Sequence, residues 1–351
     1  MGWIVSRVYL DFNATMPLRP EARAAMIKAM DVAGNPSSVH AEGRDAKSLV
    51  EAARMQVARA VGAEGAEVVF TASATEAAAL AMAGRALAGA EVEHDAVFSH
   101  LSEELQVSPE GQVLYADGDP VSVQLANSET GLLQDLADKV AVCDATQAFG
   151  KIPLAFNWLN CGMMLISAHK IGGPKGVGAL VMERGTDLTA LLKGGGQEMG
   201  RRAGTENVTG IAGFAAAATA AVDELEAGVW DRVRAMRDGF EAQVLEAAPD
   251  VVIAGAGGRR LPNTSCLIAP GWKGETQVMQ MDLKGFAISA GSACSSGKVR
   301  ESRVLRAMGY SAVEAGSAIR VSLGPTTTQD EITRFADAWL AQLEKHRARA
   351  A

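Results

Sequence analysis

The 351-residue sequence is poor in cysteine. It has four, Cys143, Cys161, Cys266 and Cys294, and none belongs to a CxxC pair or to a set with metal-ligand spacing. The first residues lack the basic and then apolar pattern of an export signal. We therefore expect no metal site, reduced thiols and a cytoplasmic location.

Long apolar runs and basic stripes are also lacking. No stretch approaches ~18 consecutive apolar residues, so no membrane span is expected. The most apolar segment, 211–222, is short and is followed by Asp223 and Glu224, which is typical of a buried helix. The formal net charge is −8, which argues against a nucleic-acid partner. The nucleotide-binding patterns GxxxxGK[ST] and GxGxxG do not occur.

The remaining composition, 48% hydrophobic and 21% charged, is that of an ordinary globular protein. Short apolar runs alternate with helical segments, which predicts an α/β fold with a mostly parallel sheet covered by helices. The predicted strands of this sheet are 68–71, 113–115, 122–125, 140–143, 163–166 and 178–182.

After residue 208 the pattern changes. A long helix is predicted over 208–247, with a break near Gly228. Beyond it, short strands and helices predict a smaller C-terminal α+β domain. The predicted strands there are 251–254, 264–268 and 288–290, and the predicted helices are 275–283, 303–308 and 329–347.

Lys170 follows a predicted strand and opens a glycine-rich loop, in the sequence SAHKIGGPKGVGA. Asp144 follows a second predicted strand. Parallel strands that end side by side would bring both residues to one cleft, where open α/β sheets bind ligands. A lysine able to form a Schiff base and an acid able to pair with a pyridinium nitrogen are the minimum apparatus of a pyridoxal phosphate site. The alternative for Lys170 is a solvated loop lysine.

Other motifs are open to two interpretations each. The segment 71–76, TASATE, suits a phosphate site at a helix N-terminus or a plain helix cap. The segment 194–207, with Arg201, Arg202 and Thr205, suits an ordered loop at an anionic site or a flexible surface loop. His94 suits an imidazole stacked on a ring or a structural histidine.

Two further residues carry possible chemistry. Cys294 lies among small polar residues in SAGSACSSG, which favours an exposed nucleophile over a buried thiol. Arg320, in GSAIRVSLG, could grip a carboxylate through two hydrogen bonds or could be solvated.

As a set, these motifs resemble those of the NifS/IscS-type cysteine desulfurases, in the class-V aminotransferase family. The resemblance runs nearly end to end and also includes VYLDFNAT, GNPSSVH, ANSETG and CDATQAFGK. It implies a pyridoxal phosphate-dependent transferase with a large cofactor-binding domain over 15–230 and a small domain over 231–351. The N-terminal segment, 1–14, is expected to pack with the small domain.

The resemblance also assigns roles. Lys170 would form the Schiff base and act as general acid and base, with Asp144 on the pyridinium nitrogen and His94 stacked on the ring. Cys294 would take the sulfur of L-cysteine as a persulfide and release alanine. The other implied contacts are Gln147 and Ser128 to the ring, Ala74, Thr75, Ser167 and His169 to the phosphate, Thr205 to the phosphate of the neighbouring subunit of a homodimer, and Asn35 and Arg320 to the substrate carboxylate.

The sequence departs from the family pattern in places. Ser128 stands where the family has an asparagine, and the family's glycine-rich TSGGTESNN is TASATEAAA here. The acceptor, a sulfur-carrying protein or an iron–sulfur scaffold, is not specified by the residues. Two alternatives remain: a selenocysteine lyase or other β-elimination enzyme, and a catalytically inactive docking protein with the same fold.

Overall fold

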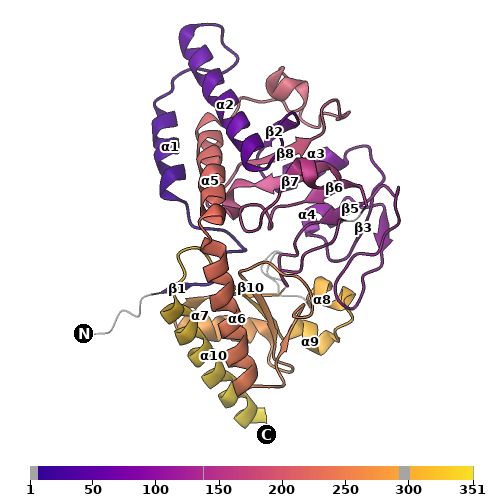
Figure 1. Cartoon of the computed structure of the whole chain (residues 1–351), viewed down its shortest axis with the longest axis vertical. Helices are drawn as coiled ribbons and strands as arrows, with labels where there is room; N and C mark the ends of the chain where they lie inside the picture. Colours follow the sequence, from indigo (N-terminus) through magenta and orange to yellow (C-terminus); the bar gives the residue numbers. More distant parts are fainter. Residues whose placement is uncertain (1–6, 137, 292–300, 351) are drawn as a thin grey trace, which may run out of the picture.

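The computed structural model describes residues 7–136, 138–291 and 301–350 (Figure 1). A five-stranded sheet forms its centre, in the order β2 (Glu67–Thr71), β8 (Gly178–Met182), β7 (Cys161–Ser167), β6 (Val140–Asp144) and β5 (Ser122–Gln124). Strands β5, β6 and β7 are parallel, so the prediction of a mostly parallel sheet is confirmed. Strand β8 is antiparallel to both of its neighbours. The connection from β7 to β8 is too short for the crossover that a parallel pair requires.

The two faces of the sheet pack against different helices, because side chains alternate along each strand. In β7, Met164 and Ile166 join the core under α2 (Ala41–Ala60) and α5 (Val208–Glu226). Met163 and Leu165 join the core under α3 (Ala74–Met82) and the short α4 (Asp95–Phe98). The sheet is therefore buried on both faces.

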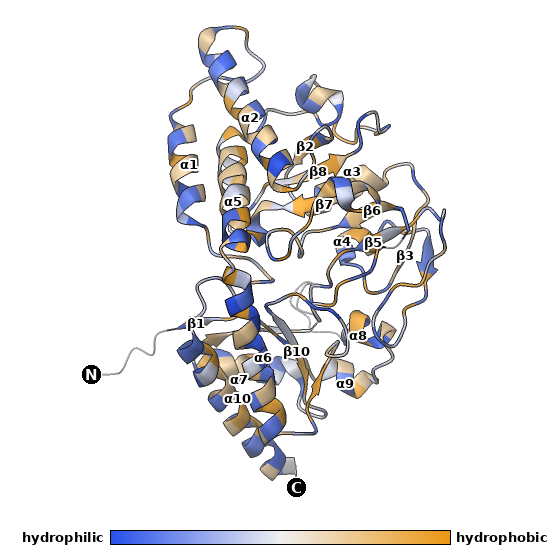
Figure 2. Cartoon of the chain, viewed as in Figure 1, coloured by the Kyte–Doolittle hydropathy of each residue, from blue (hydrophilic) through white to orange (hydrophobic). Residues whose placement is uncertain are grey.

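Helix α5 is long and apolar enough, by length and composition, to cross a membrane. In the fold it packs against α1 (Pro20–Met30) and α2, with Ile211 and Phe214 buried. In Figure 2 the buried strands β7 and β8 are mostly orange, the colour of hydrophobic residues, whereas the outer helix α1 carries both orange and blue. Burial in the core thus accounts for the apolar sequence of α5.

The predicted strand at 113–115 is wrong. Val113 forms only an isolated bridge with Val107. Its N–H donates to Gln134 Oε1 at 2.8 Å, so a side chain takes the place of a neighbouring strand. Near this segment, β3 (Ala88–Ala90) pairs in parallel with β4 (Glu103–Leu105). Single turns of 3₁₀-helix lie at Phe156–Trp158, Ala168–Lys170 and Gln197–Gly200.

Helix α5 ends before Gly228, whose left-handed φ of 71° separates it from α6 (Val229–Ala247), as predicted. The C-terminal part has an antiparallel sheet and its own core, which includes Trp272 and Trp339. The sheet order is β12 (Ser289–Ala290), β13 (Ala318–Ser322), β10 (Thr264–Ile268) and β9 (Val252–Ile253), and the helices are α7 (Gly274–Leu283), α8 (Arg303–Ala307), α9 (Ala312–Gly316) and α10 (Gln329–Ala350).

The N-terminal segment contributes to this C-terminal part. Strand β1 (Val8–Tyr9) pairs in parallel with β11 (Phe286–Ala287), and Leu10 and Phe12 are buried in the same core. The chain then crosses to the large sheet, where Met16 N–H donates to His169 O at 2.9 Å. Residues 11–15 thereby lie between the two parts of the molecule.

Candidate active site

A cavity of about 180 Å³ lies at the edge of the central sheet where β2, β5, β6 and β7 end. These four strands point the same way, so the residues that follow them converge at one edge. The lining residues are Ser73, Ala74, Thr75, His94, Ala96, Val97, Gln124, Ala126, Ser128, Asp144, Thr146, Gln147, Ser167, His169 and Lys170.

Lys170 and Asp144 line this cavity together, as their positions after two parallel strands predicted. Lys170 lies in a 3₁₀ turn directly after β7, and its Nζ donates to the backbone oxygens of Asn13 at 2.6 Å and Ala14 at 3.0 Å. Asp144 ends β6, and its Oδ1 accepts from the N–H of Thr146 at 2.9 Å. The cavity therefore holds an amine and a carboxyl group on adjacent strands.

One end of the cavity is suited to an anion. Helix α3 begins at Ala74, so its first N–H groups lie beside the cavity wall. Ser167 Oγ is buried there and has no hydrogen-bond partner in the part of the chain that the structure describes. Gly178 allows β8 to approach this turn, because a Cβ at that position would lie 2.6 Å from the carbonyl carbon of Ser73. An anion would satisfy both the helix N-terminus and the serine hydroxyl.

The two histidines of the cavity differ in environment. Burial, together with the charges of Lys170, Lys175 and Lys151, lowers the pKa of His169 to about 4, so its imidazole is neutral near pH 7. Its Nδ1 lies 3.2 Å from Thr15 Oγ1. His94 caps the short α4, and its Nδ1 accepts from the N–H of Ala96 at 3.1 Å. That hydrogen bond leaves the His94 ring at the exposed side of the cavity.

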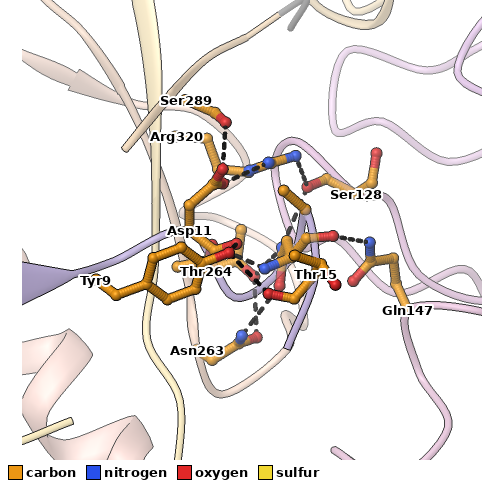
Figure 3. Close-up of polar contacts among 12 residues, drawn as sticks. Tyr9, Asp11, Thr15, Ser128, Gln147, Asn263, Thr264, Ser289 and Arg320 are labelled. Carbon is orange, nitrogen blue, oxygen red and sulfur yellow. Dashed lines mark hydrogen bonds and ion pairs between the residues drawn. The ribbon is translucent and has the colours of Figure 1, made fainter. Parts of the chain in front are cut away.

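Arg320 lies in β13 and is not part of the cavity lining, but it contacts Ser128, which is (Figure 3). Its side chain is buried and forms an ion pair with Asp11 at 2.8 Å. A second guanidinium nitrogen donates to the backbone oxygen of Ser128 at 3.1 Å, and Nε has no partner among residues 7–136, 138–291 and 301–350. Arg320 is therefore not the solvated arginine that the sequence also allowed.

Comparison with known proteins decides the family. The family model "Aminotransferase class-V" matches residues 8–106 and 101–335. The chain belongs to the class-V aminotransferase family. The cysteine desulfurase IscS of Dictyoglomus turgidum is 36% identical over 97% of this chain and 95% of its own length. The cysteine desulfurase of Cereibacter sphaeroides is 38% identical over 94% of both chains.

Solved structures agree with this class-V assignment. The NifS-like protein from Rickettsia africae has a TM-score of 0.88 and 31% identity, and the match covers 97% of this chain and 99% of that one. The structure of SspA in complex with cysteine has a TM-score of 0.76 and 25% identity, over 92% of this chain and 100% of that one. The similarity therefore extends over nearly the whole chain in the structural comparison as well as in the sequence comparison.

Three residues predicted for the site of this class-V chain do not line the cavity. Asn35 is exposed, and its Oδ1 accepts from the N–H of Ser37 at 2.9 Å. Thr205 is also exposed. Arg320 is the third, as described above. Cys294 lies outside the described residues.

The two arginines near Thr205 face carboxylates of the same chain. Arg201 pairs with Glu67, and Arg202 pairs with Glu76 at 2.8 Å. These pairs order the loop against β2 and α3 and neutralise the two positive charges. Both arginines are thus paired with acids of β2 and α3 in their own chain.

Sequence reasoning missed three buried polar residues beside the cavity. Asn13 is fully buried and contacts both parts of the molecule. Lys151 is buried four positions after Gln147, one turn along the chain, a spacing that could have indicated contact. Burial and the nearby charge of Asp144 raise the pKa of Glu93 well above its ordinary value. Glu93 directly precedes His94, and that adjacency was the available signal.

Among the described residues, no group of three or more His, Cys, Asp or Glu side chains is arranged to hold a metal ion. The three cysteines in this part of the chain, Cys143, Cys161 and Cys266, are free and buried. Burial raises the pKa of the Cys266 thiol, which disfavours the reactive thiolate.

Proposed function

We propose that this chain is a pyridoxal phosphate-dependent cysteine desulfurase, which converts L-cysteine to L-alanine and transfers the sulfur to Cys294. The observation that carries the proposal is the pair Lys170 and Asp144 in one cavity that also contains a helix N-terminus. The similarity to curated cysteine desulfurases over nearly the whole chain supports the choice of substrate.

The residues of the cavity fit pyridoxal phosphate. Ser167 Oγ and Thr146 Oγ1 are buried polar atoms without a partner among the described residues, and a bound polar group would satisfy them. The phosphate would lie at the N-terminus of α3, held by Ala74, Thr75, Ser167 and His169, and the ring would lie between His94 and Asp144. When bound, pyridoxal phosphate supplies an electron sink that weakens bonds at the substrate's Cα and Cβ.

The chain's own residues then move protons and hold the substrate. The Lys170 amine is covalently reactive only when neutral, and its position at the cavity wall lets it carry a proton to or from the substrate carbon. Arg320 would bind the substrate carboxylate through guanidinium N–H groups. Asn35 would add a second carboxylate contact after a rearrangement of its exposed segment.

Cys294 is proposed as the sulfur acceptor within the enzyme. Its thiolate attacks the sulfur of the bound substrate, a sulfur–sulfur bond forms, and the carbon–sulfur bond breaks. The carbon is protonated, so L-cysteine and the thiol give L-alanine and a persulfide on Cys294 in equal amounts. The persulfide would pass to an acceptor protein or an iron–sulfur scaffold.

We further propose that the enzyme is a cytoplasmic homodimer. Thr205 is exposed and lies outside the cavity of its own chain, and this position supports a contact with the phosphate of a neighbouring subunit. A monomer would lack that contact.

To test this proposal, the purified protein is loaded with pyridoxal phosphate and incubated with L-cysteine and a reductant. Alanine, sulfide and pyruvate are then measured together. Equal amounts of alanine and sulfide are expected. Pyruvate in place of alanine would indicate a simple β-elimination instead. A parallel incubation contains selenocysteine, and alanine from selenocysteine without any product from cysteine would indicate a selenocysteine lyase. Absence of any product would leave the docking-protein interpretation.

A further inference from the structure

Lys151 is a buried lysine that has no carboxylate partner among the described residues. Its side chain is 2% exposed. The Nζ atom donates to two amide oxygens, Gln147 Oε1 at 2.6 Å and Asn13 Oδ1 at 3.1 Å. No ion pair in residues 7–136, 138–291 and 301–350 includes Lys151, so the residue does not serve to neutralise a buried acid.

The surroundings of Lys151 are unfavourable for a positive charge. Burial, followed by the charges of Lys170 and Arg320, lowers the pKa of Lys151 well below its ordinary value. A buried amine in such a place costs stability unless its hydrogen bonds are satisfied. Any role of Lys151 must therefore act through its two hydrogen bonds, to Gln147 and Asn13.

These contacts fix the orientation of the Gln147 carboxamide. The Lys151 amine has N–H donors whether it is charged or neutral, and here it donates to Gln147 Oε1, so the oxygen of Gln147 faces Lys151. On the other side, Gln147 Nε2 donates to the backbone oxygen of Asn13 at 2.9 Å, and a carbonyl oxygen can only accept. Both contacts correspond to the same orientation of the Gln147 carboxamide, with its nitrogen on the side of the Asn13 backbone oxygen.

The orientation matters because Gln147 lines the cavity. Its Nε2 carries two hydrogens, and only one is used by Asn13. The second is available to an oxygen of a bound molecule. A rotated carboxamide would present its own oxygen instead, which would repel an anionic ring oxygen.

We propose that Lys151 is a positioning residue of the cofactor site, which holds Gln147 with an N–H donor available to the ring hydroxyl oxygen of pyridoxal phosphate. The inference rests on the proposed function, since it requires that pyridoxal phosphate occupies this cavity. Lys151 itself does not line the cavity and acts through Gln147.

The test is a double-mutant cycle on cofactor affinity. The Kd of pyridoxal phosphate is measured by absorbance titration of the apoprotein for the parent, Lys151→Met, Gln147→Ala and the double variant. Each single variant is expected to weaken binding about tenfold, the equivalent of one hydrogen bond to a charged group. The double variant is expected to be no weaker than Gln147→Ala, because Lys151 acts only through that residue.

The control is Lys139→Met, which removes an exposed lysine paired with Glu183 and should leave the Kd unchanged. If Lys151→Met does not fold, as judged by a lack of cooperative unfolding, Lys151→Leu, which also lacks an N–H donor, replaces it in the same cycle with the same criterion. A Lys151 variant that binds as the parent does, or whose loss is undiminished beside Gln147→Ala, would overturn the inference. A parent that does not bind pyridoxal phosphate would instead refute the proposed function.

Discussion

The carboxylate of Asp11 lies 2.8 Å from the guanidinium of Arg320, although 309 positions separate the two residues. Ser289 Oγ donates to the other oxygen of Asp11 at 2.8 Å, which holds the carboxylate in place. Arg320 also donates to the backbone oxygen of Ser128, beside the cavity. The N-terminal segment therefore fixes the direction of an arginine on the C-terminal sheet at the border of the candidate site.

The first prediction concerns this arginine. Arg320→Lys keeps the positive charge but loses the planar guanidinium. A lysine ammonium cannot contact Asp11, the Ser128 backbone and a substrate carboxylate at the same time. We expect the KM for L-cysteine to rise on the order of tenfold to a hundredfold, since one or two charged hydrogen bonds are lost. The Kd of pyridoxal phosphate should be unchanged. The exposed Arg306 provides the control Arg306→Lys, and an unaltered KM in Arg320→Lys would exclude Arg320 from substrate binding.

The Asp11–Arg320 pair also shows where sequence reasoning stops. Lys170 and Asp144 could be brought together from the sequence because each follows an apolar strand, and parallel strands end at a common edge. Arg320 could be identified as a candidate, but its partner lies at the opposite end of the chain, and no local pattern encodes that contact. Asn13 was missed for the same reason, since a buried amide carries no periodic signal, whereas the spacing of four between Gln147 and Lys151 was a local signal that was not used.

The sheet shows the corresponding limit for the fold. The alternation of strands and helices predicted the parallel strands, and the break predicted near Gly228 in the long helical segment is confirmed. The antiparallel direction of β8 follows from the short connection after Lys170, and connection length was not used in the prediction. The segment at 113–115 has strand composition, but a hydrogen bond from the Val113 N–H to the side-chain oxygen of Gln134 replaces the partner strand.

The second prediction concerns Ser128, which stands where the family has an asparagine. Its hydroxyl is shorter than a carboxamide, so a water could bridge it to the cofactor ring. Ser128→Asn should hold or improve the affinity for pyridoxal phosphate, by ~1 kcal/mol at most. The measurement is the Kd by absorbance titration. A large loss of affinity would mean that the surrounding side chains have adapted to serine.

The third prediction concerns the pH dependence of stability. In the unfolded chain, histidine binds a proton below pH ~6.5, whereas His169 in the fold does so only below about 4. Between these values the unfolded state binds more protons, so the stability contributed by neutral His169 is lost as the pH falls through this window. His169→Gln should reduce the stability difference between pH 7 and pH 4.5, measured by urea unfolding of the apoprotein. The exposed His100 gives the control His100→Gln, and equal pH dependence in all three proteins would contradict the prediction.

The fourth prediction separates the cysteines. Cys294→Ser should bind pyridoxal phosphate and L-cysteine but form no persulfide, because a hydroxyl is a far weaker nucleophile towards sulfur. Cys143→Ser, Cys161→Ser and Cys266→Ser are matched controls, since these three thiols are buried and should not exchange sulfur. Alkylation and mass spectrometry after a single turnover measure the persulfide. Alanine formation by Cys294→Ser at the parent rate would rule out the persulfide route.

The central claim is that Lys170 binds pyridoxal phosphate covalently in the cavity at the end of β7. The most direct measurement is borohydride reduction of the loaded protein, followed by peptide mass spectrometry, with Lys170→Ala in parallel. The account predicts a visible absorbance band that borohydride removes, a pyridoxyl group on Lys170, and neither in Lys170→Ala. A pyridoxyl group on another lysine, or an unchanged reducible band in Lys170→Ala, would contradict it.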